Sequence, residues 1–99
     1  MSVYFIANIK MDDEKEYNKY IQKSSEVFNQ YSGRYITVDD NPIILEGEWK
    51  YSRVVIIEFP CQEMFDAWYY SDAYQEILKH RLSGAKCDTI LVTSGKWGK

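Results

Sequence analysis

Charged side chains within apolar stretches are the residues of this chain best suited to chemistry. Glu46 and Glu58 are flanked by apolar residues, and burial raises a carboxyl pKa unless a cation or hydrogen-bond donors hold the group ionised. Arg34, Arg53 and Arg81 are the candidate cations. In a pocket between sheet and helices, an acid could act as general base while an arginine holds an anionic or carbonyl substrate. The favoured alternative is that these groups form structural salt bridges that fix the register of strands and helices, because structural ion pairs perturb pKa values just as catalytic pairs do.

Three aromatic side chains, Trp68, Tyr69 and Tyr74, could form the walls of such a pocket. Aromatic residues at helical spacing more often belong to a core or an interface, so only geometry can decide between these roles. The candidate catalytic residues are Glu58, Arg34 and Tyr69. The candidate ligand-binding residues are Arg34, Glu46, Arg53, Trp68, Tyr74 and Arg81.

The single histidine and the two cysteines predict no metal site and imply no cofactor. His80 has no Cys or Asp at ligand spacing beside it. Cys61 and Cys87 are too far apart for a CxxC motif and are expected to be reduced, packed thiols. Cys61 also follows Pro60 at the start of an expected helix, where the helix dipole can lower a thiol pKa, so its reactivity stays open.

Length and charge predict one small domain over residues 1–99 and exclude two classes of partner. A formal net charge of −3 and a pI near 5.1, without a basic stripe, argue against a nucleic-acid binder. No apolar run reaches the roughly 18 residues that a membrane span needs. Met1 to Met11 lacks a basic segment and a cleavage site, and we expect a cytoplasmic protein.

The first half of the chain predicts a strand and a helix. Val3 to Ile9 is β-branched and aromatic, which is typical of a buried strand. Asp13 followed three residues later by Glu16 forms a capping box, and Gly33 is expected in the C′ position at the other helix end. The residues expected on the apolar helix face are Tyr17, Tyr20, Ile21, Ser24, Phe28 and Tyr31.

Three extended segments follow, separated by residues with turn chemistry: Arg34 to Val38, Ile43 to Trp49 and Arg53 to Phe59. Pro42 cannot donate to a strand ladder, so its element is expected at a sheet edge. A two-residue turn at Lys50 and Tyr51 would place Glu48 opposite Arg53, a cross-strand pair that contributes about 0.2 to 1 kcal/mol.

The second half of the chain predicts a broken helix and a last strand. The helix Gln62 to Tyr70 is interrupted at Ser71 and Asp72, where Asp72 is the expected cap of a further helix that ends at Gly84. Arg81 is the charged residue on the otherwise apolar face of this helix. Thr89 to Thr93 is the expected last strand.

The order β-α-β-β-α-β is that of an α+β, ferredoxin-like unit, with an antiparallel sheet and both helices on one face. The other face then carries apolar side chains from Val3 to Ile9 and from Val54 to Phe59. Sheet-to-sheet packing of two copies would cover them, so a homodimer is predicted. Binding of RNA by the sheet is rejected, because Val54 to Ile57 is aliphatic where RNA-recognition domains carry stacking aromatics.

Several spaced motifs resemble the DUF1330 family: Gly33-Arg34-Tyr35, Leu45-Glu46-Gly47, Arg53 to Pro60, Trp68-Tyr69 with Ser71 and Tyr74, and Arg81. The resemblance covers Val3 to about Val92 and implies a dimeric α/β barrel, a fold shared with antibiotic-biosynthesis monooxygenases and muconolactone isomerase-like proteins. The family has no established activity. An Arg-Gly-Gly turn of the family is replaced by Val38-Asp39-Asp40, so no anion site is expected there.

Two functions remain open for a small homodimer that binds a hydrophobic or anionic metabolite. The first is a cofactor-independent enzyme of the monooxygenase or isomerase type, which predicts an enclosed pocket into which Glu58, Arg34 or Tyr69 converge. The alternative is a non-enzymatic binding or structural dimer, which predicts the same pocket with its carboxylates held in salt bridges. The sequence names neither the reaction nor the substrate.

Overall fold

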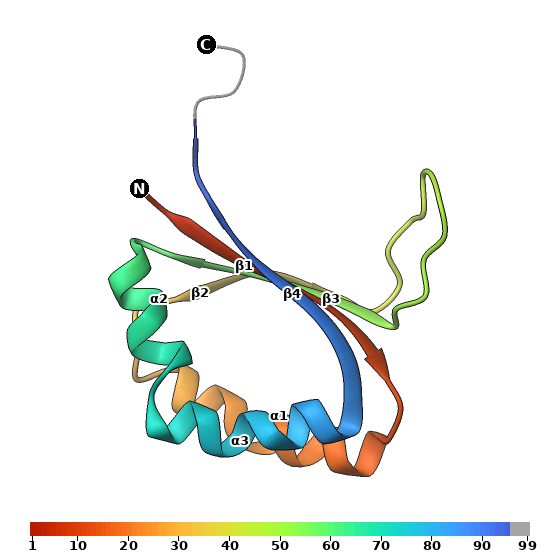
Figure 1. The fold of residues 1–99 in the computed structure, drawn as a ribbon, viewed down its shortest axis with the longest axis horizontal. Helices are drawn as coiled ribbons and strands as arrows, with labels where there is room; N and C mark the ends of the chain where they lie inside the picture. Colours follow the sequence, from red (N-terminus) through yellow and green to blue (C-terminus); the bar gives the residue numbers. More distant parts are fainter. Residues whose placement is uncertain (96–99) are drawn as a thin grey trace.

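A four-stranded antiparallel sheet and three helices form the fold in the computed structural model, which describes residues 1–95. The elements in chain order are β1 (Val3–Met11), α1 (Glu14–Phe28), β2 (Arg34–Asp39), β3 (Arg53–Phe59), α2 (Gln62–Tyr69), α3 (Asp72–Gly84) and β4 (Ala85–Thr93). The strand order is β2-β3-β1-β4, and the helices all lie on one side of the sheet (Figure 1). The ferredoxin-like α+β prediction is confirmed.

The strand register divides the side chains of the sheet between two faces. In β1, Val3, Phe5, Ala7 and Ile9 are buried against the helices, while the intervening residues point to the face that no helix of residues 1–95 covers. Antiparallel pairing carries this alternation into β3 and β4, where the uncovered face receives Val54, Ile56, Glu58, Ile90 and Val92. We call this the open face.

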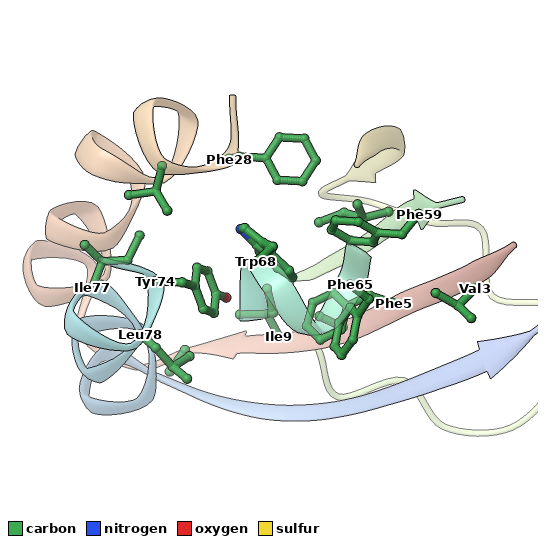
Figure 2. Close-up of a cluster of buried hydrophobic side chains, with 14 of the residues drawn as sticks. Val3, Phe5, Ile9, Phe28, Phe59, Phe65, Trp68, Tyr74, Ile77 and Leu78 are labelled. Atoms are coloured by element: carbon green, nitrogen blue, oxygen red, sulfur yellow. The ribbon is translucent and has the colours of Figure 1, made fainter. Parts of the chain in front are cut away.

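The core lies between the sheet and the helices, with the indole of Trp68 at its centre (Figure 2). Its ring centroid is 5.3 Å from that of Phe59, 5.6 Å from that of Phe5 and 4.2 Å from that of Tyr74. Because these rings come from β3, β1 and α3, one side chain of α2 joins three further elements. Aromatic pairs at such distances stabilise the fold beyond the area they bury.

The expected N-cap of α1 at Asp13 is confirmed, but the capping box is incomplete, because the Asp13 amide donates to the Gly84 carbonyl and not to Glu16. The predicted C′ role of Gly33 is wrong. The Asp13 side chain accepts a hydrogen bond from the Glu16 amide at 3.2 Å, as the pattern predicts. The helix ends at Phe28, several residues before Gly33. A Cβ atom at Gly33 would lie 2.6 Å from the Phe59 ring, so close packing against that ring explains the glycine.

The break between α2 and α3 falls at the predicted place, but the cap is Ser71 and not Asp72. The Ser71 hydroxyl accepts a hydrogen bond from the Tyr74 amide at 3.0 Å, and Asp72 is the first helical residue. The last strand begins at Ala85, earlier than the expected Thr89, because the chain passes directly from α3 into β4.

The end of α3 is tied to the start of α1 at Gly84. Its carbonyl accepts hydrogen bonds from the amides of Asp12 and Asp13 at 2.9 and 2.8 Å. A Cβ atom at this position would lie 2.5 Å from the Tyr17 backbone nitrogen, so α1 and α3 can approach this closely only because residue 84 is glycine. This contact sets the relative positions of Tyr17 on α1 and Arg81 on α3.

The predicted strand Ile43 to Trp49 is wrong. Residues 40–52 form an arm without strand structure that projects from the sheet on the side of the open face (Figure 1). Arg53 holds the base of the arm through Asp40, at 2.5 and 3.1 Å, so the expected cross-strand pair with Glu48 does not form. Pro42, from which an edge strand is expected, lies in this arm and not in a strand, and the segment before it, β2, is an outer strand of the sheet.

Among the helices of residues 1–95, none is both long enough and apolar enough to cross a membrane.

Candidate functional site

A cavity of about 240 Å³ lies between α1 and the helix-covered face of the sheet. Apolar side chains of β1, β2 and β3 line most of it, and α1 contributes Tyr17, Tyr20, Ile21 and Ser24. Arg53 and Arg81 are the charged members of the lining described for residues 1–95, and that lining includes no carboxylate and no imidazole. The cavity is therefore apolar with a positive bias.

Arg81 is a buried cation without a counter-ion in residues 1–95. The residue is only 3% exposed, and its Nε and Nη1 atoms are buried without a hydrogen-bond partner. Tyr74 and Cys87 lie within hydrogen-bonding reach of the guanidinium group, but neither is an acidic counter-ion. The ion pairs of the described chain involve other residues. Its guanidinium carbon lies 5.8 Å from the centroid of the Tyr20 ring, which attracts the cation but accepts no conventional hydrogen bond. Arginine stays protonated in proteins, so the charge persists.

Two tyrosine hydroxyl groups lie beside this cation. The hydroxyls of Tyr20 and Tyr74 are 2.9 Å apart and share a hydrogen bond. Burial raises the pKa of Tyr20 well above its ordinary value, and Tyr74 adds to the effect. Burial also raises the pKa of Tyr74, while the charge of Arg81 opposes this shift. Both groups are neutral at physiological pH. One hydroxyl donates its proton to the other, and the accepting hydroxyl can still donate its own proton to a third group.

Arg53, the second cation of the lining, is neutralised from outside the cavity. Its bidentate pair with Asp40 is the main reason that its pKa is raised. The same pair lowers the pKa of Asp40. Arg53 also donates a long hydrogen bond to the Tyr17 hydroxyl at 3.4 Å. Of the two arginines that line the cavity, Arg81 is the one whose charge remains uncompensated.

Glu58 and Arg34, two of the candidate catalytic residues, lie on the open face and not in the cavity. Arg34 Nη2 is 2.6 Å from Glu58 Oε1, and the Tyr4 hydroxyl donates to the same carboxylate at 3.2 Å. Hydrogen bonds from Ser2 and Arg34 lower the pKa of Glu58. This carboxylate is ionised and held by donors, which is the arrangement of a structural salt bridge.

The remaining candidates from the sequence are dispersed. Glu46 is exposed in the arm, and Trp68 belongs to the core. Tyr69 stacks on Phe65 with ring centroids 5.2 Å apart, outside the lining of the cavity. Tyr74 approaches the site through its hydroxyl contact with Tyr20. Of the residues predicted from the sequence, the fold therefore brings only Arg53, Tyr74 and Arg81 to the cavity.

Among the residues of the lining that sequence reasoning missed are its three tyrosines: Tyr17, Tyr20 and Tyr35. Tyr17 and Tyr20 were expected on the apolar face of the first helix, but only as core residues. A usable signal was available, because a tyrosine on a buried face needs a partner for its hydroxyl. The same argument would have directed attention to a polar group at the end of α3, where Arg81 lies.

Outside the cavity, His80 and the cysteines offer no metal site. The Nδ1 atom of His80 is 2.5 Å from Glu16 Oε2, and hydrogen bonds from His80 and Lys19 lower the pKa of Glu16. No group of three potential metal ligands occurs in the part of the chain that the structure describes. Cys61 is the N-cap residue of α2 without a side-chain capping bond, and Cys87 packs against the core.

The cavity is chemically suited to hold an apolar molecule and to stabilise negative charge on it. Arg81 and the hydroxyl pair supply positive charge and neutral donors, which also favour an oxyanion in a reaction. The lining described in residues 1–95 contains no side chain that acts as a general base near neutral pH.

Solved structures with low sequence identity share this fold. A protein of unknown function from Rhodopseudomonas palustris aligns with a TM-score of 0.79 and 19% identity over 96% of this chain and 83% of its own. A dimeric ferredoxin-like protein of unknown function from Jannaschia aligns with a TM-score of 0.71 and 8% identity over 95% of this chain and 100% of its own.

SnoaB, a cofactor-independent oxygenase from Streptomyces nogalater, is also similar, with a TM-score of 0.67 and 12% identity over 96% of this chain and 94% of its own. At these identities the likeness concerns the fold alone. Among curated proteins no match is found. A family model described as a domain of unknown function, DUF1330, matches residues 2–94. The chain therefore belongs to the DUF1330 family.

Proposed function

We propose that this protein is a homodimer that binds a small hydrophobic or anionic metabolite in the cavity of each protomer. The observation that carries the proposal is an apolar cavity whose lining includes the buried cation of Arg81, which has no acidic partner in residues 1–95. Small-molecule sites are typically apolar hollows with a few polar groups that orient the ligand. The core does not need a charge at this position to be stable, because replacing buried charges by apolar residues is often neutral or stabilising.

The open face supports the homodimer. Ile90, on its outer strand, is 58% exposed in the single chain, and Ile6, Val54 and Ile56 lie beside one another on the neighbouring strands. The arm projects on the same side of the sheet (Figure 1). Two of its residues, Ile43 and Leu45, are 87% and 88% exposed. Several exposed apolar side chains on one side of the molecule favour association. The proteins from Jannaschia and from Thermobifida fusca that share the fold are described as dimeric.

Binding without catalysis is favoured over a proton-abstracting reaction. The candidate base Glu58 is held by Arg34 on the other face of the sheet, and the described lining of the cavity offers no replacement. The likeness to SnoaB keeps a cofactor-independent oxygenase as the second candidate, since Arg81 and the tyrosine pair could stabilise a substrate oxyanion.

Native mass spectrometry of the purified protein tests both parts of the proposal. We expect a dimer that carries one small molecule in each protomer. Ile56→Lys places a charge in the middle of the open face and should weaken the dimer by 100-fold or more. Leu82→Lys is the control, because Leu82 is an exposed apolar residue on α3, away from the open face.

Two results would contradict the proposal. A wild-type monomer, or a dimer that Ile56→Lys and Leu82→Lys disturb equally, would remove the open face as the interface. Failure of the wild-type dimer to retain or bind any small apolar molecule would remove the cavity as a binding site.

A further inference from the structure

We propose that the ligand of the cavity is a small apolar carboxylate and that Arg81 binds its carboxyl group. This inference rests on the proposed function and names the chemical class of the ligand. It starts from Arg81, which lines the cavity, is 3% exposed and has no acidic partner in residues 1–95, while its Nε and Nη1 atoms are buried without a hydrogen-bond partner. A protein seldom leaves charged donors unsatisfied in its interior unless another molecule completes them.

The charge of the cavity selects the ligand class. Asp40 compensates Arg53, so a single positive charge, that of Arg81, remains for the ligand. A monoanion balances it, whereas a phosphate ester with two charges would leave one of them in an apolar site. The planar guanidinium group can also form two parallel hydrogen bonds with a planar carboxylate, which it cannot form with a spherical anion such as chloride.

Neutral donors beside Arg81 complete the anion site. The Tyr20 and Tyr74 hydroxyls share one hydrogen bond at 2.9 Å, which leaves one proton available for a carboxylate oxygen. The Tyr20 ring also lies against the guanidinium group and restricts its movement. The lining described for residues 1–95 contains no carboxylate that would repel such an anion.

Size and polarity define the rest of the ligand. The volume of about 240 Å³ is below the range of roughly 300 to 1,000 Å³ that is typical of sites for drug-sized molecules. Phe5, Ala7 and Ile57 of the sheet and Ile21 of α1 give the cavity apolar walls. A carboxylate with a short aliphatic or single-ring body fits both the size and the walls.

Matched pairs of acids and amides test the inference. Hexanoate, benzoate and 3-phenylpropanoate are titrated into the purified dimer, each beside its primary amide, and binding is followed by calorimetry and by protein NMR. Each amide preserves shape and apolar area but lacks the charge. We expect each acid that binds to do so at least ten-fold more tightly than its amide, because charge-assisted hydrogen bonds are stronger than neutral ones.

Arg81→Met and Arg34→Met form the matched pair of variants. Arg81→Met should abolish the preference for the acid, while the ligand-free variant is at least as resistant to urea as the wild type because an uncompensated charge has been removed. Arg34→Met removes an exposed arginine on the open face and should keep the preference. Tyr20→Phe should weaken acid binding several-fold and leave amide binding unchanged.

The outcomes separate this inference from the proposed function. If amides bind as tightly as their acids, the carboxylate class is wrong and the cavity still binds small apolar molecules. If neither series binds and no molecule is retained in native mass spectrometry, the proposed function itself fails. If Arg81→Met does not fold, the acid and amide series on the wild-type protein still decides the question.

Discussion

The two faces of the sheet use the same kind of residue in opposite ways. On the open face, Arg34 has a side chain that is 73% exposed and is paired with Glu58 at 2.6 Å. On the helix-covered face, Arg81 is 3% exposed and its Nε and Nη1 atoms have no partner in residues 1–95. Exposed pairs of the first kind contribute little to stability. A lone buried charge is destabilising by itself, and this is the observation on which the proposed binding role of Arg81 rests.

The type of side chain alone does not identify a binding site. Both arginines were candidates for the same pocket, and the sheet separates them. Arg34 stands opposite Glu58 in neighbouring strands, which makes the pair a local consequence of register. Arg81 reaches the cavity only because α3 packs against α1, a contact between elements that are distant in the sequence.

The largest expected effect on stability comes from breaking the close contact between Gly84 of α3 and the start of α1. Gly84→Ala places a methyl group 2.5 Å from the Tyr17 backbone nitrogen and should lower the free energy of unfolding by about 1 to 3 kcal/mol or more. Gly95→Ala is the control, since a Cβ atom there meets its nearest neighbour only at 4.0 Å. Its effect should stay within about 0.5 kcal/mol. Urea denaturation of both variants measures the difference, and equal effects would contradict the close contact.

An intermediate effect is expected from the tyrosine pair at alkaline pH. Burial raises the folded-state pKa of Tyr20 above the ordinary value of 10.0, so its contribution to stability is complete below pH 10 and is lost as the pH rises towards that folded-state value. Stability of the wild type should therefore fall more steeply above pH 10 than that of Tyr20→Phe. Tyr74→Phe should show the same direction. Parallel curves of stability against pH would show that neither hydroxyl is shielded from water.

The smallest effect is expected on the open face at acid pH. Hydrogen bonds from Ser2 and Arg34 lower the folded-state pKa of Glu58 below the ordinary value of 4.5, so its contribution is present above that value and is lost as the pH falls through the lowered one. Glu58→Gln should be slightly less stable than the wild type at pH 7 and equal to it near pH 2. Thermal unfolding at both pH values measures this, and a difference that persists at pH 2 would contradict the ion pair as its cause.

Local signals predicted much of the fold and little of the candidate site. The N-cap at Asp13 and the break before Asp72 depend on nearest neighbours along the chain. The arm was mistaken for a strand because Ile43 to Trp49 has strand composition, but a strand needs a partner and none pairs with it in residues 1–95. Gly33 was assigned to a helix end for a similar reason, although the Phe59 ring requires it.

What the sequence alone determined is the order of the elements and the two-sided apolar character of the sheet, because hydrophobic periodicity and capping are local properties. The tertiary structure decided which charges meet. It paired Arg34 with Glu58 and Arg53 with Asp40, and it left Arg81 beside Tyr20 without an acidic partner in residues 1–95. The physical reason is that an ion pair depends on distance in space, which only the packing of helices on the sheet defines.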